Sequence, residues 1–85
     1  MFRIKKREIT IVADVNYAVD LEAFLNHNVK TYGAHNVYVK RDSVFYTFTT
    51  KLTTKEVADL FKKKIYKGKV LYSDCGLVIV DFYLK

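Results

Sequence analysis

The sequence predicts an α+β protein, more specifically a ferredoxin-like two-layer α/β sandwich with two helices on one face of an antiparallel sheet. Three observations support this prediction. Apolar and polar residues alternate along five short segments, two other segments have helical spacing, and the segments follow the order β-α-β-β-α-β-β. Two helices on one side of a sheet suit this order, and right-handed crossovers give the ferredoxin-like arrangement with one extra terminal strand.

The composition is typical of one folded domain, and we expect residues 1–85 to form it. The chain contains no proline and only three glycines, so no linker is expected. Fifteen lysines and arginines against nine aspartates and glutamates give a net charge of +6. This excess suggests an anionic partner such as nucleic acid, although solubility alone is an alternative explanation.

The cysteine count and the N-terminal sequence predict a cytoplasmic protein. The single cysteine, Cys75, excludes an internal disulfide framework and is typical of a reducing compartment. The apolar run at residues 9–15 is interrupted by Thr10 and Asp14, so we expect no signal peptide and no membrane partner. The absence of tryptophan, with abundant lysine and tyrosine, hints at an AT-rich or thermophilic genome, such as that of a virus.

The first half of the chain predicts a strand, a helix and a hairpin. Residues 8–15 alternate as a strand does. Asp20 is the expected N-cap of the first helix, with Val19 and Phe24 as a hydrophobic staple, and Gly33 is expected to end that helix at about Tyr32.

Residues 37–41 and 44–50 are predicted to form a β-hairpin around a two-residue loop of Asp42 and Ser43. This loop would pair Val39 with Tyr46 and place both side chains on the inner face of the sheet, together with Val37, Val44 and Phe48.

The second half predicts another helix and another hairpin. Residues 53–56 match a capping box, in which Thr53 and Glu56 satisfy each other's backbone groups, and Gly68 is expected to end this helix. Residues 69–73 and 77–84 are predicted strands joined by a three-residue loop that ends in a left-handed Gly76. The helix's inward residues are Val57, Ala58, Leu60, Phe61 and Ile65.

Apolar side chains remain on the outer face of this predicted sheet, where no helix covers them. A contiguous exposed apolar patch usually marks an interaction surface. We therefore expect a homodimer that forms through this face, with another protein, or nucleic acid stacked on Tyr38 and Phe45, as alternatives. The predicted interface residues are Val12, Tyr38, Phe45, Leu71, Leu77, Ile79 and Tyr83.

The basic residues predict a surface that contacts a phosphate backbone. Some surround the end of the second helix and the start of the next strand, and the others precede the first strand. Compensation of the helix dipole is the alternative explanation for the lysines at the helix end. The predicted nucleic-acid-binding residues are Lys62, Lys63, Lys64, Lys67, Lys69, Lys5, Lys6 and Arg7.

Two family resemblances bear on function. The layout and the aromatic side chains on an open sheet resemble an RNA-recognition domain, which implies stacking on bases. Arg41, Phe45 and Phe48 would take the basic and aromatic places of its third-strand motif, but Asp42 and Ser43 stand where that family has glycine and an aromatic residue.

Asp14 at the end of the first strand and Ser43-Val44-Phe45 at the start of the third are similar to features of the small CRISPR-adaptation nucleases. That resemblance implies a metal-dependent nuclease with Asp14 as a metal ligand. The N-terminal extension and the longer second strand depart from the pattern of that family.

Other catalytic and metal-binding patterns are weak, so we expect no catalytic residue, metal or cofactor. Asp14 and Asp81 share the outer face, but Asp81 is expected to oppose a lysine in the final hairpin. His27, His35 and Cys75 have no zinc-site spacing, and the sequence has no glycine-rich phosphate loop.

The sequence therefore predicts a small, non-enzymatic binding protein that dimerises through its sheet and binds nucleic acid through a basic surface. The alternative is an inhibitor or adaptor, such as a compact viral protein, that docks on another protein through its apolar sheet face. A metal-dependent nuclease is the minor alternative.

Overall fold

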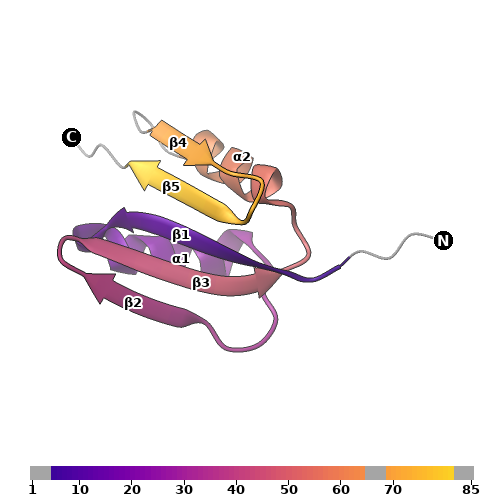
Figure 1. Cartoon of the computed structure of the whole chain (residues 1–85), viewed down its shortest axis with the longest axis horizontal. Coiled ribbons are helices and arrows are strands. Elements are labelled where there is room, and N and C mark those ends of the chain that lie inside the picture. The colour runs from indigo at the N-terminus through magenta and orange to yellow at the C-terminus, as the bar shows by residue number, and fades with distance from the viewer. Residues whose placement is uncertain (1–4, 65–68, 82–85) are drawn as a thin grey trace.

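The computed structural model describes residues 5–64 and 69–81, and over these residues the elements follow the predicted order (Figure 1). The elements are β1 (Arg7–Asp14), a short 3-10 helix η1 (Val15–Tyr17), α1 (Ala18–Asn28), β2 (Asn36–Lys40), β3 (Ser43–Thr50), α2 (Thr54–Lys64), β4 (Lys69–Tyr72) and β5 (Leu77–Asp81). The predictions for Ile65, Lys67, Gly68 and Tyr83 concern residues outside the described part of the chain.

The strands form one mixed sheet in the order β2-β3-β1-β5-β4. β1 is antiparallel to β3 but parallel to β5, so the predicted antiparallel sheet is wrong, and the strand order departs from the ferredoxin-like pattern. The last strand lies inside the sheet beside β1, because Val78 and Val80 give it a fully buried face. β4, which begins with Lys69, takes the edge, where charge is tolerated.

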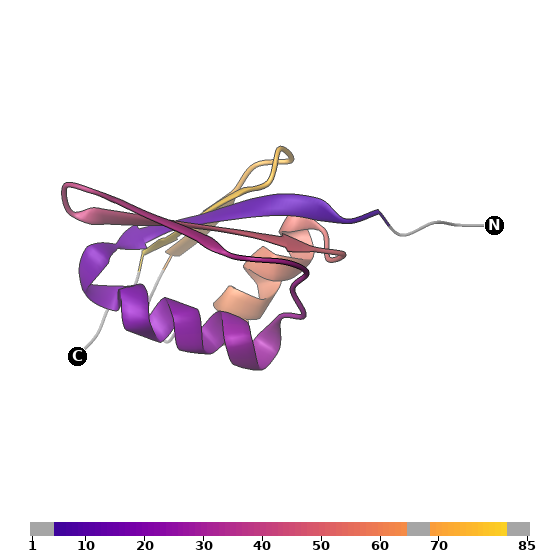
Figure 2. The ribbon, with the colours of Figure 1, turned by 90° about the horizontal axis from the view of Figure 1, so that it is seen from below.

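Both helices lie on the same side of this sheet, as Figure 2 shows from below. Phe24 of α1 and Phe61 of α2 stack with ring centroids 4.3 Å apart, which joins the two helices beneath the sheet. Neither described helix has the length and apolarity needed to cross a bilayer. The buried core consists of Ile9, Ile11, Ala13, Leu21, Leu25, Val29, Val44, Tyr46, Phe48, Val57, Ala58, Phe61, Val78 and Val80.

The start of α1 differs from the prediction. The side chain of Asp14 accepts a hydrogen bond of 2.8 Å from the backbone N–H of Asn16, which caps the 3-10 helix, and α1 continues from that turn. Asp20 therefore lies in the first turn of α1 rather than at its N-cap. Val19 is 78% exposed, so the predicted hydrophobic staple is absent.

The end of α1 also differs, because the helix stops at Asn28 rather than near Tyr32. Val29 takes an extended conformation and is buried in the core. The chain then runs beside β3, where the backbone N–H of Tyr32 donates to the Thr49 carbonyl at 2.9 Å. Burial of Val29 and this sheet-like contact replace the last predicted turn of helix.

The first hairpin has its loop one residue earlier than predicted, at Arg41 and Asp42, and Arg41 adopts a positive φ of 55°. The Asp42 carbonyl accepts a hydrogen bond of 2.7 Å from Val15, which fixes this loop at the end of β1. The predicted pairing is therefore wrong, and Val39 pairs with Val44. The register moves by an even number of residues, so each side chain keeps its predicted face.

The second hairpin has the predicted register. Leu71 pairs with Ile79, and Ser73 donates to the Leu77 carbonyl at 2.9 Å. Gly76 has a φ of +93°, and a Cβ atom there would lie 2.6 Å from the Glu8 carbonyl oxygen. Only glycine allows this loop to approach β1 so closely.

The capping box of α2 is confirmed. The backbone N–H of Thr53 donates to Glu56 Oε1 at 2.8 Å, and the backbone N–H of Glu56 donates to Thr53 Oγ1 at 3.1 Å. The hydrogen bond from the Thr53 backbone N–H lowers the pKa of the Glu56 carboxyl, and the Thr53 side chain and the Arg7 guanidinium lower it further. The ionised form of the Glu56 side chain therefore stabilises the first turn of α2.

A short polar chain crosses the inner side of the sheet at His35. Its Nδ1 lies 2.8 Å from the Tyr46 hydroxyl, and its Nε2 lies 2.7 Å from Thr31 Oγ1. Burial raises the pKa of the Tyr46 phenol, and the Glu22 carboxylate raises it further. The neutral Tyr46 hydroxyl thus anchors the 29–35 connection to β3.

We expect Tyr46→Phe to reduce the free energy of unfolding by about 1 kcal/mol, because His35 loses a partner in a partly buried site. Urea unfolding followed by circular dichroism measures this change. Tyr38→Phe, at an exposed position, is the matched control and should change stability by less than about 0.5 kcal/mol. Equal effects in the two variants would contradict a structural role for the hydrogen bond.

We expect Glu56→Gln to reduce stability at neutral pH but not at strongly acidic pH. The pKa of Glu56 is lowered in the folded state, so its contribution is present above the unfolded-state pKa and disappears as the pH falls through the folded-state pKa. Thermal unfolding across a pH series should therefore show the wild-type and variant curves converging in acid. Glu22→Gln, which removes one carboxylate at an exposed position of α1, is the control for the loss of charge alone. The same pH-dependent difference in both variants would contradict the role of the capping box.

Candidate functional site

The structure separates the predicted basic residues into two groups. Lys69 at the start of β4 pairs with Asp81 at the end of β5, whereas Arg7 at the start of β1 pairs with Thr50. Because β1 and β5 are parallel, these two groups lie at opposite ends of the sheet. Lys62 and Lys63 are exposed at the α2 end, on the Lys69 side, whereas Lys5 and Lys6 are exposed on the Arg7 side. The side chain of Lys64 and all of Lys67 lie outside the described part of the chain.

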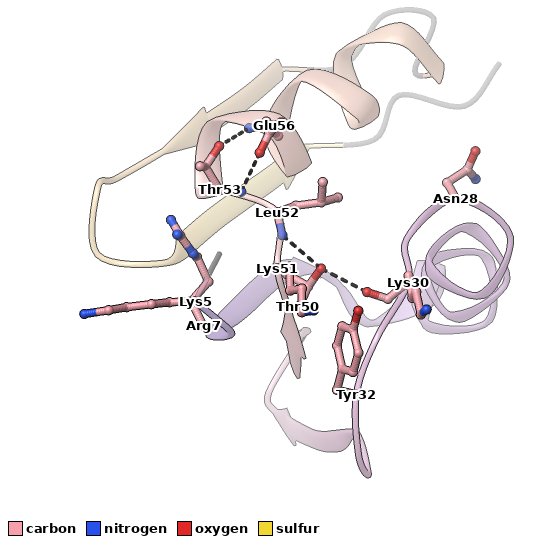
Figure 3. Close-up of a pocket in the computed structure, with 10 residues that line it drawn as sticks. All are labelled: Lys5, Arg7, Asn28, Lys30, Tyr32, Thr50, Lys51, Leu52, Thr53 and Glu56. Carbon is pink, nitrogen blue, oxygen red and sulfur yellow. Dashed lines mark hydrogen bonds between the residues drawn. The ribbon is translucent and has the colours of Figure 1, made fainter. Parts of the chain in front are cut away.

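The Arg7 end holds a pocket of about 820 Å³, which we call the basic pocket (Figure 3). It lies where three connections meet: the segment before β1, the segment after α1, and the link between β3 and α2. Four cationic side chains and one carboxylate line it. The lining residues are Lys5, Arg7, Asn28, Lys30, Tyr32, Thr50, Lys51, Leu52, Thr53 and Glu56.

Tyr32 is the aromatic centre of the basic pocket. The ammonium nitrogens of Lys6, Lys30 and Lys51 lie 4.7, 5.6 and 5.4 Å from the centroid of its ring. Each distance is within the range of a cation–π interaction. The ring therefore holds three lysines close together that would otherwise repel one another.

Backbone contacts fix the two segments that carry these lysines. Thr50 is 1% exposed, and its hydroxyl donates to the Lys30 carbonyl at 2.9 Å and accepts from the Leu52 backbone at 3.3 Å. Figure 3 shows these bonds linking the segment after α1 to the end of β3. Lys30 and Lys51 therefore project from a fixed scaffold, in which the Tyr32 backbone is also bonded to β3.

The charge in the basic pocket is unbalanced. Lys5, Arg7, Lys30 and Lys51 line it, whereas Glu56 is the only carboxylate among the lining residues, and that carboxylate accepts a hydrogen bond from the Thr53 backbone N–H. This excess of positive charge favours an anionic ligand over a cationic one.

The sequence singled out Lys5, Lys6 and Arg7, of which Lys5 and Arg7 line the basic pocket, but it did not single out Lys30, Tyr32 or Lys51. The missed residues lie between elements and are far apart along the chain. Only the pairing of β1 with β3 and the path of the connection after α1 bring them together. The short segment Lys30-Thr31-Tyr32, a lysine two residues before a tyrosine, carries no recognisable motif.

Five of the predicted interface residues form one row across the outer face of the sheet. Tyr38 pairs with Phe45, Phe45 with Val12, Val12 with Ile79, and Ile79 with Leu71. Tyr38 and Phe45 contact each other at a ring centroid distance of 5.8 Å near the β2 edge, whereas Leu71, Leu77 and Ile79 are exposed on β4 and β5. Thr47 and Thr10 lie in the neighbouring row, where Thr10 pairs with Leu77, and the two threonine hydroxyls lie 2.9 Å apart. Val12 and Phe45 are half-buried. Tyr83 lies outside the described residues.

Asp14 and Asp81, considered as a possible pair from the sequence, line one pocket of about 310 Å³ together with Asp42 and Lys69. Asp14 already accepts a hydrogen bond from Asn16. Within residues 5–64 and 69–81, no three histidine, cysteine, aspartate or glutamate side chains are placed to share a metal ion.

The predicted soft ligands are dispersed. His27 is exposed on α1, His35 contacts two hydroxyl groups, and Cys75 is exposed in the loop between β4 and β5. No protein-family model and no curated protein matches this chain, so the basic pocket itself is the basis for any functional assignment.

Proposed function

We propose that this protein is a small non-enzymatic protein that binds nucleic acid through the basic pocket. The single observation that carries the proposal is the cluster of Lys6, Lys30 and Lys51 around the ring of Tyr32. Lys5 and Arg7 line the same pocket. The proposal keeps the predicted nucleic acid as partner but moves the main site away from the end of α2.

The chemistry of the pocket suits a phosphate backbone. Lysine acts on phosphate as a point charge, so several lysines give affinity that depends on salt and little on sequence. An aromatic ring among cations is the combination that single-strand-binding proteins use. Threonine hydroxyls near the cations, as at Thr53, are common phosphate contacts.

The test is a titration with a mixed-sequence single-stranded oligonucleotide at several salt concentrations. We expect Lys30→Gln with Lys51→Gln to weaken binding and to reduce the slope of log Kobs against log salt by about 1.4, since two phosphate contacts are lost. Fluorescence anisotropy measures both quantities.

Lys62→Gln with Lys63→Gln is the matched control, because it removes the same charge at the opposite end of the sheet. Net charge is then equal in the two double variants, so a difference between them reports the site. Equal weakening would indicate a diffuse charge effect and contradict the basic pocket as the site. No binding by the wild-type chain at low salt would overturn the proposed function.

We also expect Glu56→Gln to tighten binding of the same oligonucleotide several-fold, because it removes the only carboxylate among the residues that line the pocket. Glutamine retains the acceptor that a capping box requires, so α2 should still begin at Thr54. The measurement is the same anisotropy titration. Unchanged affinity in a folded Glu56→Gln variant would mean that the ligand binds elsewhere.

The second candidate function is docking on another protein through the apolar outer face. It is favoured by Leu71, Leu77 and Ile79, which are 61, 38 and 42% exposed and adjacent on β4 and β5. Such binding should be nearly independent of salt, unlike phosphate binding. A metal-dependent nuclease centred on Asp14 stays the minor alternative, and loss of such an activity in Asp14→Ala would support it.

A further inference from the structure

β2 forms one edge of the sheet, and all five of its residues are exposed. Val37, Tyr38 and Val39 are 54, 58 and 52% exposed, although the two valines were predicted to lie in the core. Val19 of α1 is also exposed and lines the same shallow pocket as Val37. Proteins usually protect a free strand edge with a central charge or a proline, and β2 has neither.

The hairpin loop determines which backbone groups of β2 face outward. Lys40 and Ser43 close a two-residue loop, and closing residues direct their N–H and C=O groups toward each other. The direction of the backbone N–H and C=O groups alternates along a strand. The groups of Val37 and Val39 therefore point away from β3. The edge of β2 therefore offers two N–H donors and two C=O acceptors. Val37 carries one donor and one acceptor, and so does Val39.

The sequence of β2 has the same polarity pattern in both directions. Asn36-Val37-Tyr38-Val39-Lys40 reads polar, apolar, aromatic, apolar, polar. We propose that β2 pairs antiparallel with β2 of a second copy of this chain, about a two-fold axis at Tyr38. The two five-stranded sheets then become one continuous sheet.

This register satisfies the groups on both sides of the edge. Val37 lies opposite Val39 of the second copy, so the outward backbone groups of all four valines pair in hydrogen bonds. Lys40 lies opposite Asn36 of the second copy, so no like charges face each other. The two Tyr38 rings meet at the axis, each beside the Phe45 ring that already lies 5.8 Å away in its own chain.

The other edge strand, β4, fits a second copy less well. Val70 of β4 packs on the core, and Lys69-Val70-Leu71-Tyr72 has no symmetric pattern. Pairing of β2 with β4 of another copy would be head-to-tail and would build open chains rather than a closed dimer. The β2 dimer also differs from the predicted outer-face dimer, since it uses the edge of the sheet and leaves the face open.

Cysteine cross-linking tests the axis directly, in a Cys75→Ser background. Tyr38→Cys would place two cysteines opposite each other in a non-hydrogen-bonded pair, about 4.5 Å apart at Cα, which is within the disulfide range. We expect a reducible covalent dimer in a glutathione redox buffer. Asn36→Cys is the matched control and should form no covalent dimer, because the residue opposite it is Lys40 of the second copy.

Analytical ultracentrifugation of variants without new cysteines gives the second measurement. We expect the wild-type chain and Leu71→Lys to be dimers and Val39→Lys to be a monomer. Circular dichroism should show that Val39→Lys is folded. A monomeric wild type, a dimer that survives Val39→Lys but not Leu71→Lys, or open polymers would each overturn the proposal. The glutamine variants of Lys30 and Lys51 should still dimerise, so this result is independent of nucleic-acid binding.

Discussion

The antiparallel pairing of β1 with β3, from Arg7 opposite Thr50 to Asp14 opposite Ser43, is the constraint on which the rest of the structure depends. It places Ile9 and Ile11 in the middle of the sheet with no exposed area. It also makes the chain before β1 and the chain after β3 leave the sheet side by side. A slip of one residue would reverse every side chain and bury threonines in place of the core, so this register is strongly determined.

Two signals whose residues lie close together in sequence predicted their structures correctly. The capping box at Thr53 and Glu56, and the loop ending at Gly76, depend on local backbone geometry and appear as expected. The α+β class and the element order depend on the same local patterns. The predicted start of α1 at Asp20 was wrong because the 3-10 turn that Asp14 caps leads directly into the helix.

Features set by distant contacts were not predictable. The parallel pairing of β5 with β1 depends on where the final hairpin enters the sheet, and neither strand's alternation specifies a neighbour. The loop at Arg41 and Asp42 is selected by a hydrogen bond from Val15. For the same reason half of the basic pocket was missed: charge can be counted from sequence, but the approach of Lys30 and Lys51 to Tyr32 requires the folded connections.

The basic pocket and the proposed dimer interface at β2 lie on different parts of the molecule. The basic pocket lies at the end of the sheet where β2 begins, since Asn36 pairs with Thr47 and Tyr32 is bonded to Thr49. An antiparallel β2 pair reverses the second chain, so the two pockets would lie at opposite ends of the joined sheet. Two like-charged pockets kept apart repel each other weakly, because surface charges separated by more than about 8 Å are largely screened at physiological salt. Because the two basic pockets are far apart, a chain with a net charge of +6 can self-associate. The dimer then offers two anion-binding sites to one long nucleic-acid strand.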